Sequence, residues 1–200
     1  MVTALTIFAI QVGRSRTLSK EKGKQIIDNL QQLPHLIEEY LDNQGPIMEA
    51  VDLVKHAKCV LFLGRGISAP VAKEGALKLM EVAYIPCLAY PAGEMKHGPI
   101  ALLEEGSPVI FVVPNDHVKE KSRSAIHECR ARGAKIILIH EAGDDISGEG
   151  DINIAIPQVN NYLSPMLSVI PLQLIAYHTA IALGCDVDRP RNLAKSVTVE

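Results

Sequence analysis

Short, uniformly apolar runs separated by helical stretches constrain the fold of this chain more than any other feature. Residues 59–63, Cys-Val-Leu-Phe-Leu, end in Gly64-Arg65-Gly66 and lead into a helical pattern, which indicates a strand, a glycine-rich turn and a helix. Strands that are apolar on both faces are typical of a parallel sheet covered by helices on both sides. The sequence therefore predicts a three-layer α/β/α sandwich with a five-stranded parallel sheet. Its strands are expected at residues 59–63, 87–90, 108–113, 134–140 and 152–156.

Helical periodicity accounts for most of the remaining chain. The first helix, residues 1–15, begins without a capping residue, so we expect the sequence to be part of a longer polypeptide. Pro34 should kink the second helix. The expected helices lie at about 1–15, 19–41, 46–56, 118–132 and 165–183, and another follows Ser68 and carries Glu74 to Glu81. We divide the chain into a helical extension (1–45), an α/β domain (46–185) and a C-terminal tail (186–200).

Charge and hydropathy argue against two kinds of partner. The net charge is −3, from 20 basic and 23 acidic residues, and there is no long basic run, so we expect no nucleic-acid binding. The longest hydrophobic segment, residues 162–184, is interrupted by Pro165, Pro171 and His178. It falls short of an uninterrupted span of about 20 apolar residues, which favours a buried core or interface helix over a membrane helix.

The cysteines predict neither a disulfide framework nor a metal site. No Cys-x-x-Cys pair occurs among them, and no histidine completes a zinc-binding pattern. They are expected to be small core residues in a reducing environment, so the predicted location is cytoplasmic and no metal is expected. The four cysteines are Cys59, Cys87, Cys129 and Cys185.

One expected helix carries three ionisable residues on a single face. At about 100° per residue, Lys78 lies roughly 40° to one side of Glu74, and Glu81 lies roughly 20° to the other. Most neighbouring residues are apolar, which leaves a narrow polar stripe on a helix suited to burial. Such a stripe can serve acid–base chemistry on a bound substrate. The alternative is an ordinary surface pair of Glu74 and Lys78, which contributes about 0.2–0.5 kcal/mol to a helix.

Several motifs resemble one enzyme family over essentially the whole chain. They are residues 62–66 (Phe-Leu-Gly-Arg-Gly), 74–79 (Glu-Gly-Ala-Leu-Lys-Leu), 92–99 (Ala-Gly-Glu-Met-Lys-His-Gly-Pro) and the terminal block 188–200. Together they closely resemble the glucosamine-6-phosphate synthase family, the isomerising glutamine:fructose-6-phosphate amidotransferases. The resemblance is to the second sugar isomerase (SIS) half of the family's isomerase module. The terminal block is the most specific part, because many SIS proteins share the glycine-rich turn.

The resemblance implies a set of site residues. Glu81 matches the base that moves a proton between C1 and C2 of the sugar, and His97 matches the acid/base that opens the ring. Lys195 matches the lysine that forms a Schiff base with open-chain fructose 6-phosphate. No metal or other cofactor is implied, and the ligands are fructose 6-phosphate and glucosamine 6-phosphate. The supporting or substrate-binding residues are Glu74, Lys78 and Ala194.

Two parts of the family's enzyme have no counterpart in this sequence, namely the glutaminase domain and the first SIS half with its phosphate-binding loop. Residues 1–15 match the last helix of that first half. We therefore expect a fragment that is inactive alone and pairs as a homodimer, in which His97 faces the partner's Glu81. The alternatives are a non-catalytic SIS domain that binds sugar phosphates for regulation, and a related deglycase or isomerase of amino-sugar phosphates.

Overall fold

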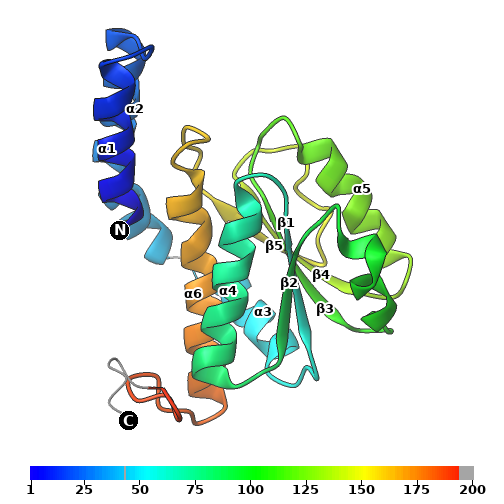
Figure 1. Cartoon of the computed structure of the whole chain (residues 1–200). Helices are drawn as coiled ribbons and strands as arrows, with labels where there is room; N and C mark the ends of the chain where they lie inside the picture. Colours follow the sequence, from blue (N-terminus) through cyan, green and yellow to red (C-terminus); the bar gives the residue numbers. More distant parts are fainter. Residues whose placement is uncertain (43, 194–200) are drawn as a thin grey trace, which may run out of the picture.

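The computed structural model describes residues 1–42 and 44–193 and has the predicted three layers (Figure 1). Its sheet has five parallel strands in the order β2-β1-β3-β4-β5. Every strand begins and ends within about one residue of its predicted position, because apolar runs mark the strands and glycine or proline stands near most of their ends. The strands are β1 (Val60–Gly64), β2 (Cys87–Pro91), β3 (Pro108–Val113), β4 (Lys135–Glu141) and β5 (Ile152–Ile156).

Helices cover both faces of the sheet. The helices are α1 (Val2–Arg14), α2 (Lys20–Leu41), α3 (Gly45–Val54), α4 (Ser68–Ala83), α5 (Lys119–Arg130) and α6 (Ser164–Ala182), with short 3₁₀ helices η1 (Met95–His97) and η2 (Pro99–Leu102). One face packs against α3, α4 and α6, and the other packs against α5 and the two 3₁₀ helices. The α1–α2 pair projects beyond the sheet (Figure 1). Ser19 caps α2, since its Oγ accepts a hydrogen bond from the backbone N–H of Lys22 at 3.2 Å.

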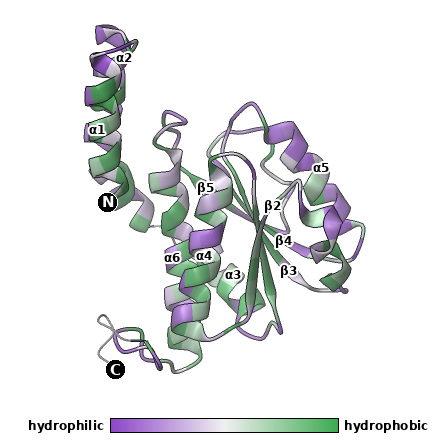
Figure 2. Ribbon diagram, in the orientation of Figure 1, coloured by the Kyte–Doolittle hydropathy of each residue, from purple (hydrophilic) through white to green (hydrophobic). Residues whose placement is uncertain are grey.

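Alternate residues of the central strands point into two separate hydrophobic cores. Phe62 and Ile110 belong to the core beneath α4 and α6, whereas Leu61 and Phe111 belong to the core beneath α5. The central strands are therefore buried on both faces, as their uniform apolarity predicts. Figure 2 shows these strands as hydrophobic and most of α5 as hydrophilic.

The turn between β1 and α4 is too tight for most side chains. A Cβ atom at residue 64 would lie 2.3 Å from the carbonyl oxygen of Ser68, and Gly66 has a φ of +58°. Glycine tolerates both the close approach and the left-handed backbone. This turn starts α4 directly at the carboxyl end of β1, which positions the ionisable residues of α4.

The predicted core helix α6 packs closely on α4. By length and composition alone α6 could cross a membrane, but Leu172 and Ile175 are each 1% exposed within the hydrophobic core. At residue 75 of α4, a Cβ atom would lie 2.7 Å from Leu172 Cδ1. Glycine at this position therefore allows the two helices to approach each other.

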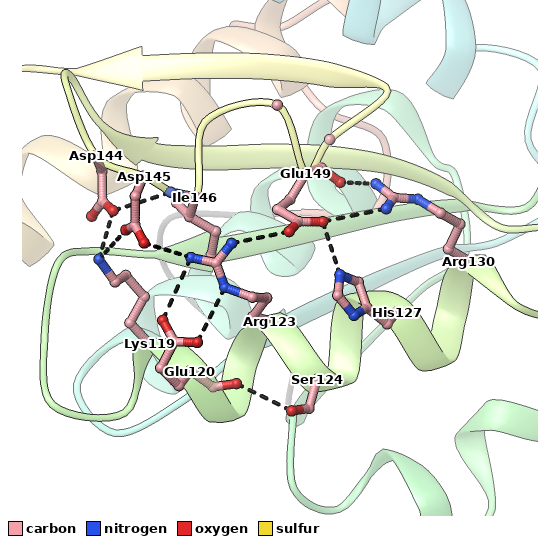
Figure 3. A network of polar contacts seen from close by, with 12 residues as sticks. Lys119, Glu120, Arg123, Ser124, His127, Arg130, Asp144, Asp145, Ile146 and Glu149 are labelled. Carbon is pink, nitrogen blue, oxygen red and sulfur yellow. Dashed lines mark hydrogen bonds and ion pairs between the residues drawn. The ribbon is translucent and has the colours of Figure 1, made fainter.

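A network of ion pairs joins α5 to the loop between β4 and β5 (Figure 3). Lys119 Nζ lies 2.7 Å from Asp144 Oδ1 and also pairs with Asp145. Arg123 lies 2.9 Å from Asp145 Oδ2 and 3.0 Å from Glu149 Oε1. Hydrogen bonding, first from Lys119, lowers the pKa of Asp145 to about 2. This network holds the β4–β5 loop on the face of the sheet opposite α4.

Candidate active site

The three ionisable residues predicted on one helix face do meet in the structure. On α4, Lys78 Nζ lies 2.6 Å from Glu81 Oε2 and 3.6 Å from Glu74 Oε1. The hydrogen bond with Glu81 is the main cause that raises the pKa of Lys78, against an opposing effect of burial. Lys78 is therefore a cation between two carboxylates. The side chains are about one third to one half exposed, so solvent or a ligand can reach them.

The surroundings of this polar stripe differ from the sequence prediction in one respect. Leu77 and Met80, expected to be apolar neighbours on a buried helix, are 41% and 39% exposed. The reason is that α4 packs on the sheet and α6 through its opposite side, where Ala76 and Leu79 are buried. The polar stripe and its apolar neighbours thus form an open surface in the described part of the chain.

His97 lies on the other side of the sheet from the α4 residues. It ends η1, where the preceding Met95 is fully buried in the core beneath α5. Lys96 Nζ forms a 2.7 Å ion pair with Glu128 Oε1 of α5, which holds η1 against that helix. His97 itself is exposed, and in residues 1–42 and 44–193 no hydrogen bond or ion pair joins its side chain to α4. Within one chain, therefore, His97 and Glu81 are not brought together.

The beginning of the C-terminal tail is attached to the end of α4 that carries Glu81. The backbone N–H of Arg191 donates to the Tyr84 hydroxyl at 2.8 Å, and the Arg191 guanidinium lies 4.1 Å from the centre of the Tyr84 ring. Tyr84 is the C-cap of α4 and has a left-handed backbone, with a φ of 59°. The tail thus passes beside the last turn of α4. Lys195 and Ala194, which follow a few residues later, lie outside the described residues.

Two contacts near this site were not predicted from the sequence. Tyr84 has no periodic or motif signal that distinguishes it from a core aromatic, although Arg191 falls in the terminal block. The second contact joins the turns after β1 and β2. The Arg65 side chain lies against Gly93, since a Cβ atom added at residue 93 would be 2.7 Å from Arg65 Nη2. Both residues stand in glycine-containing motifs that suggested close packing without showing what packs there.

The fold and the polar stripe together define a doubly wound α/β domain that carries acid–base side chains on a helix beside its sheet. Comparison with protein families gives a more particular assignment, since the SIS domain model matches residues 53–183. The chain belongs to the SIS domain family.

Similar proteins cover the entire chain. Glutamine–fructose-6-phosphate aminotransferase (isomerizing) of Thermus thermophilus is 46% identical over 202 aligned residues, and that of Pseudomonas aeruginosa is 43% identical over 201. All of this chain is aligned in both cases, but it spans only 33% of each relative's length.

Solved structures support the same fold. The C-terminal domain of glucosamine-fructose-6-phosphate aminotransferase from Francisella tularensis has a TM-score of 0.88 and 35% identity. The alignment covers 93% of this chain and 53% of that one. Glucosamine-6-phosphate deaminase from Thermotoga maritima has a TM-score of 0.68 at 23% identity, over 98% of this chain and 57% of that one. At that identity, the second likeness supports the fold alone.

Proposed function

We propose that this chain forms the C-terminal SIS part of a glutamine–fructose-6-phosphate aminotransferase. In this role it helps convert fructose 6-phosphate and ammonia into glucosamine 6-phosphate, in the cytoplasm. The observation that carries the proposal is similarity over the full chain, at 46% identity, to an enzyme of that name. The polar stripe on α4 supports it because ketose–aldose isomerisation needs a base beside the carbon acid. The other two thirds of such an enzyme supply ammonia and the main phosphate contacts.

Glu81 is the proposed base that carries a proton from C1 to C2. Its ion pair with Lys78 holds the carboxylate in one orientation, and orientation of a catalytic group lowers the activation barrier. Glu74 lies on the other side of Lys78 and extends the polar surface along the helix. We assign Glu74 and Lys78 to positioning and to contacts with sugar oxygens.

Lys195 is the proposed nucleophile toward the open-chain sugar. Its amine adds to the C2 carbonyl and water leaves, which gives a Schiff base. Ammonia then takes the place of the lysine at C2, and proton transfer from C1 to C2 completes the amino aldose. The contact of Arg191 with Tyr84 supports this role, because it anchors the tail beside the helix that carries Glu81. Ala194 is assigned to substrate contacts next to the lysine.

His97 is the proposed ring-opening acid/base and acts on the site of a second copy. Its position across the sheet from α4 supports sharing, since one chain does not bring His97 and Glu81 together. A closed two-fold dimer would place each histidine against the partner's α4, and this symmetry is the commonest among soluble oligomers. The proposed assembly is therefore a homodimer with two shared sites.

A chimeric enzyme tests the function. The aligned third of the Thermus thermophilus enzyme is replaced by this chain, and glucosamine 6-phosphate is measured from fructose 6-phosphate and ammonia. The chimera should be active, and Glu81→Gln should lower its kcat by at least about 10²-fold, as expected for loss of an acid–base group. Glu49→Gln, on the exposed part of α3, is the matched control and should retain activity. A folded chimera that binds fructose 6-phosphate without turnover would favour a non-catalytic SIS domain.

The same chimera tests the lysine and the shared histidine. Borohydride reduction with fructose 6-phosphate should label Lys195, and labelling that persists in Lys195→Arg contradicts its assignment. Mixing the inactive His97→Ala and Glu81→Gln chimeras should restore part of the activity, because a mixed dimer has one intact site. Variants that never complement, although they form mixed dimers, would show that each subunit uses its own histidine.

A further inference from the structure

A polar cavity lies at the carboxyl edge of the sheet. Its volume is about 410 Å³, within the range of small-molecule sites. Glu141 is the last residue of β4, and Asn115 follows the neighbouring strand β3. Open α/β sheets bind ligands outside the carboxyl ends of their strands. Glu81 and His97 are absent from the described lining of this cavity, which lies among different elements.

Side-chain amides dominate the lining. We call the space the amide cavity, and it is lined by Asn29, Gln32, Asn115, Glu141, Gln158, Val159, Asn160 and Asn161. Residues of α2 face the sheet edge across it, and the segment before α6 completes the wall. Each amide offers both a donor group and an acceptor oxygen. A wall of this composition matches a ligand that is rich in hydroxyl groups, because each hydroxyl also donates and accepts.

Glu141 provides a buried acceptor without a partner. The residue is 4% exposed, and its Oε1 atom has no hydrogen-bond partner within the described residues. Burial is the main cause that raises its pKa, opposed by a hydrogen bond from the backbone of Asn115. Buried polar atoms are nearly always hydrogen-bonded, because an unpaired one has lost its hydrogen bonds to water without replacement. Glu141 also lines the amide cavity, so a hydroxyl or amino group of a ligand would satisfy Oε1 once the carboxyl group turns toward the cavity.

Two amides of the cavity are already oriented by the protein. Gln158 Nε2 donates to the carbonyl oxygen of Ala142 at 2.9 Å, which leaves the Gln158 carbonyl oxygen as an acceptor. Asn160 Oδ1 accepts from the backbone N–H of Tyr162 at 3.0 Å, which leaves the Asn160 amino group as a donor. Preorganised donors and acceptors reduce the entropy lost on binding.

The charges around the amide cavity select against anions. Glu141 is its charged lining residue, and no lysine, arginine or histidine belongs to the described lining. Asp144 and Asp116 add negative charge near Glu141, and Lys119 is the nearby cation that partly offsets it. A phosphate group would therefore meet the Glu141 carboxyl group, with no lysine, arginine or histidine in the described lining to pair with.

We propose that the amide cavity binds an unphosphorylated sugar, with a hydroxyl or amino group of the sugar donating to Glu141. This site is separate from the polar stripe on α4, and the inference does not depend on the proposed function. D-glucosamine is the preferred probe, because its ammonium group complements the carboxylate. Glucosamine 6-phosphate, which adds only the phosphate group, should bind here at least about tenfold more weakly.

Calorimetric titration of the full chain tests this inference. D-glucosamine should bind, and Glu141→Gln should weaken its affinity by about tenfold, which corresponds to about 1.4 kcal/mol. Gln32→Ala, at an exposed position of α2 in the wall, should also weaken binding, and it keeps the test valid if Glu141→Gln unfolds. Glu38→Gln, exposed on the same helix and outside the lining, is the charge-matched control and should bind like the wild type.

Two results would overturn the site. One is no heat of binding for D-glucosamine or D-glucose at millimolar concentration. The other is unchanged affinity in both folded variants, which would locate binding elsewhere on the chain. Calorimetry needs no turnover, so failure of the proposed function does not affect this result.

Discussion

Replacing Gly75 by alanine should destabilise the protein, although the same change stabilises most helices. In an open helix, Gly→Ala gains about 1 kcal/mol of helix propensity. At position 75 the new Cβ would lie 2.7 Å from Leu172 Cδ1 and 3.0 Å from Leu172 Cβ and Cγ. Carbon atoms pack best at about 3.5–4.0 Å, so α4 and α6 would need to separate or repack.

The sizes of these opposing effects determine the sign of the change. Overpacking a core costs about 1–3 kcal/mol, and Leu172 is only 1% exposed, so it cannot move into solvent. After the propensity gain, a net loss of about 1 kcal/mol is expected for Gly75→Ala. Gly23→Ala in α2 is the matched control. The nearest atom to its new Cβ is Cδ of the exposed Arg14, at 2.8 Å, and this long side chain can shift, so the variant should gain up to about 1 kcal/mol.

Urea unfolding measures the free energy of unfolding of both variants. Gly75→Ala should fall below the wild type and Gly23→Ala should rise above it, so the two variants should differ by about 2 kcal/mol. Leu172→Ala should lose about 2–5 kcal/mol by itself. In the double variant with Gly75→Ala, the extra methyl occupies space that Leu172 has left, so the two losses should sum to less by about 1 kcal/mol. A Gly75→Ala variant as stable as the Gly23→Ala control would refute the close approach of α4 and α6.

Two further variants test the tail anchor and the network on α5. Tyr84→Phe removes the hydroxyl that accepts a hydrogen bond from the Arg191 amide, so exchange of that amide hydrogen should accelerate about fivefold, as for a lost bond of about 1 kcal/mol. Tyr177→Phe, at an exposed tyrosine, is the control. Equal exchange rates in the two variants would contradict the contact. The pKa of Asp145, about 2, lies below its unfolded value near 3.8, so its ion pairs stabilise the fold above about pH 4 and lose this effect as the pH falls toward 2. Asp145→Asn should therefore have a lower free energy of unfolding in urea than the wild type at pH 7, and this difference should disappear between pH 4 and 2. Asp28→Asn is the control and should differ little from the wild type. A difference for Asp145→Asn that stays constant with pH would contradict the role of its ion pairs.

The sheet could be predicted from the sequence because each strand is marked by its own residues. A run such as β3, Pro108–Val113, is apolar throughout and ends beside a proline, so both its type and its bounds are local properties. Whether the outer surface of a helix is buried is not a local property of its residues. Leu77 and Met80 are apolar, but whether they are covered depends on which other elements reach α4. Periodicity contains no information about those elements.

The candidate site was predictable to the same local extent. Helical spacing alone placed Glu74, Lys78 and Glu81 on one face, and the structure adds that Lys78 pairs more closely with Glu81, at 2.6 Å, than with Glu74, at 3.6 Å. The side of the sheet on which His97 lies depends on how η1 packs, and no local pattern determines that. The amide cavity was missed for a similar reason, because its lining combines segments from α2 to the start of α6 that are far apart in sequence.

The arrangement of α4, η1 and the tail has a consequence for how such a site can assemble. Glu81 and Lys78 stand on a helix fixed by the core, whereas His97 belongs to the opposite layer and Lys195 to the segment after Leu193. Under the proposed function, folding of the α/β domain alone orients the proposed base Glu81, and a second copy would supply His97. The exposed apolar residues beside Lys78 fit this order of events, because a surface that is covered only on association can stay open in the single chain. An enzyme built in this way would couple ring opening to assembly, since a lone subunit would hold the proposed base Glu81 without the proposed acid His97.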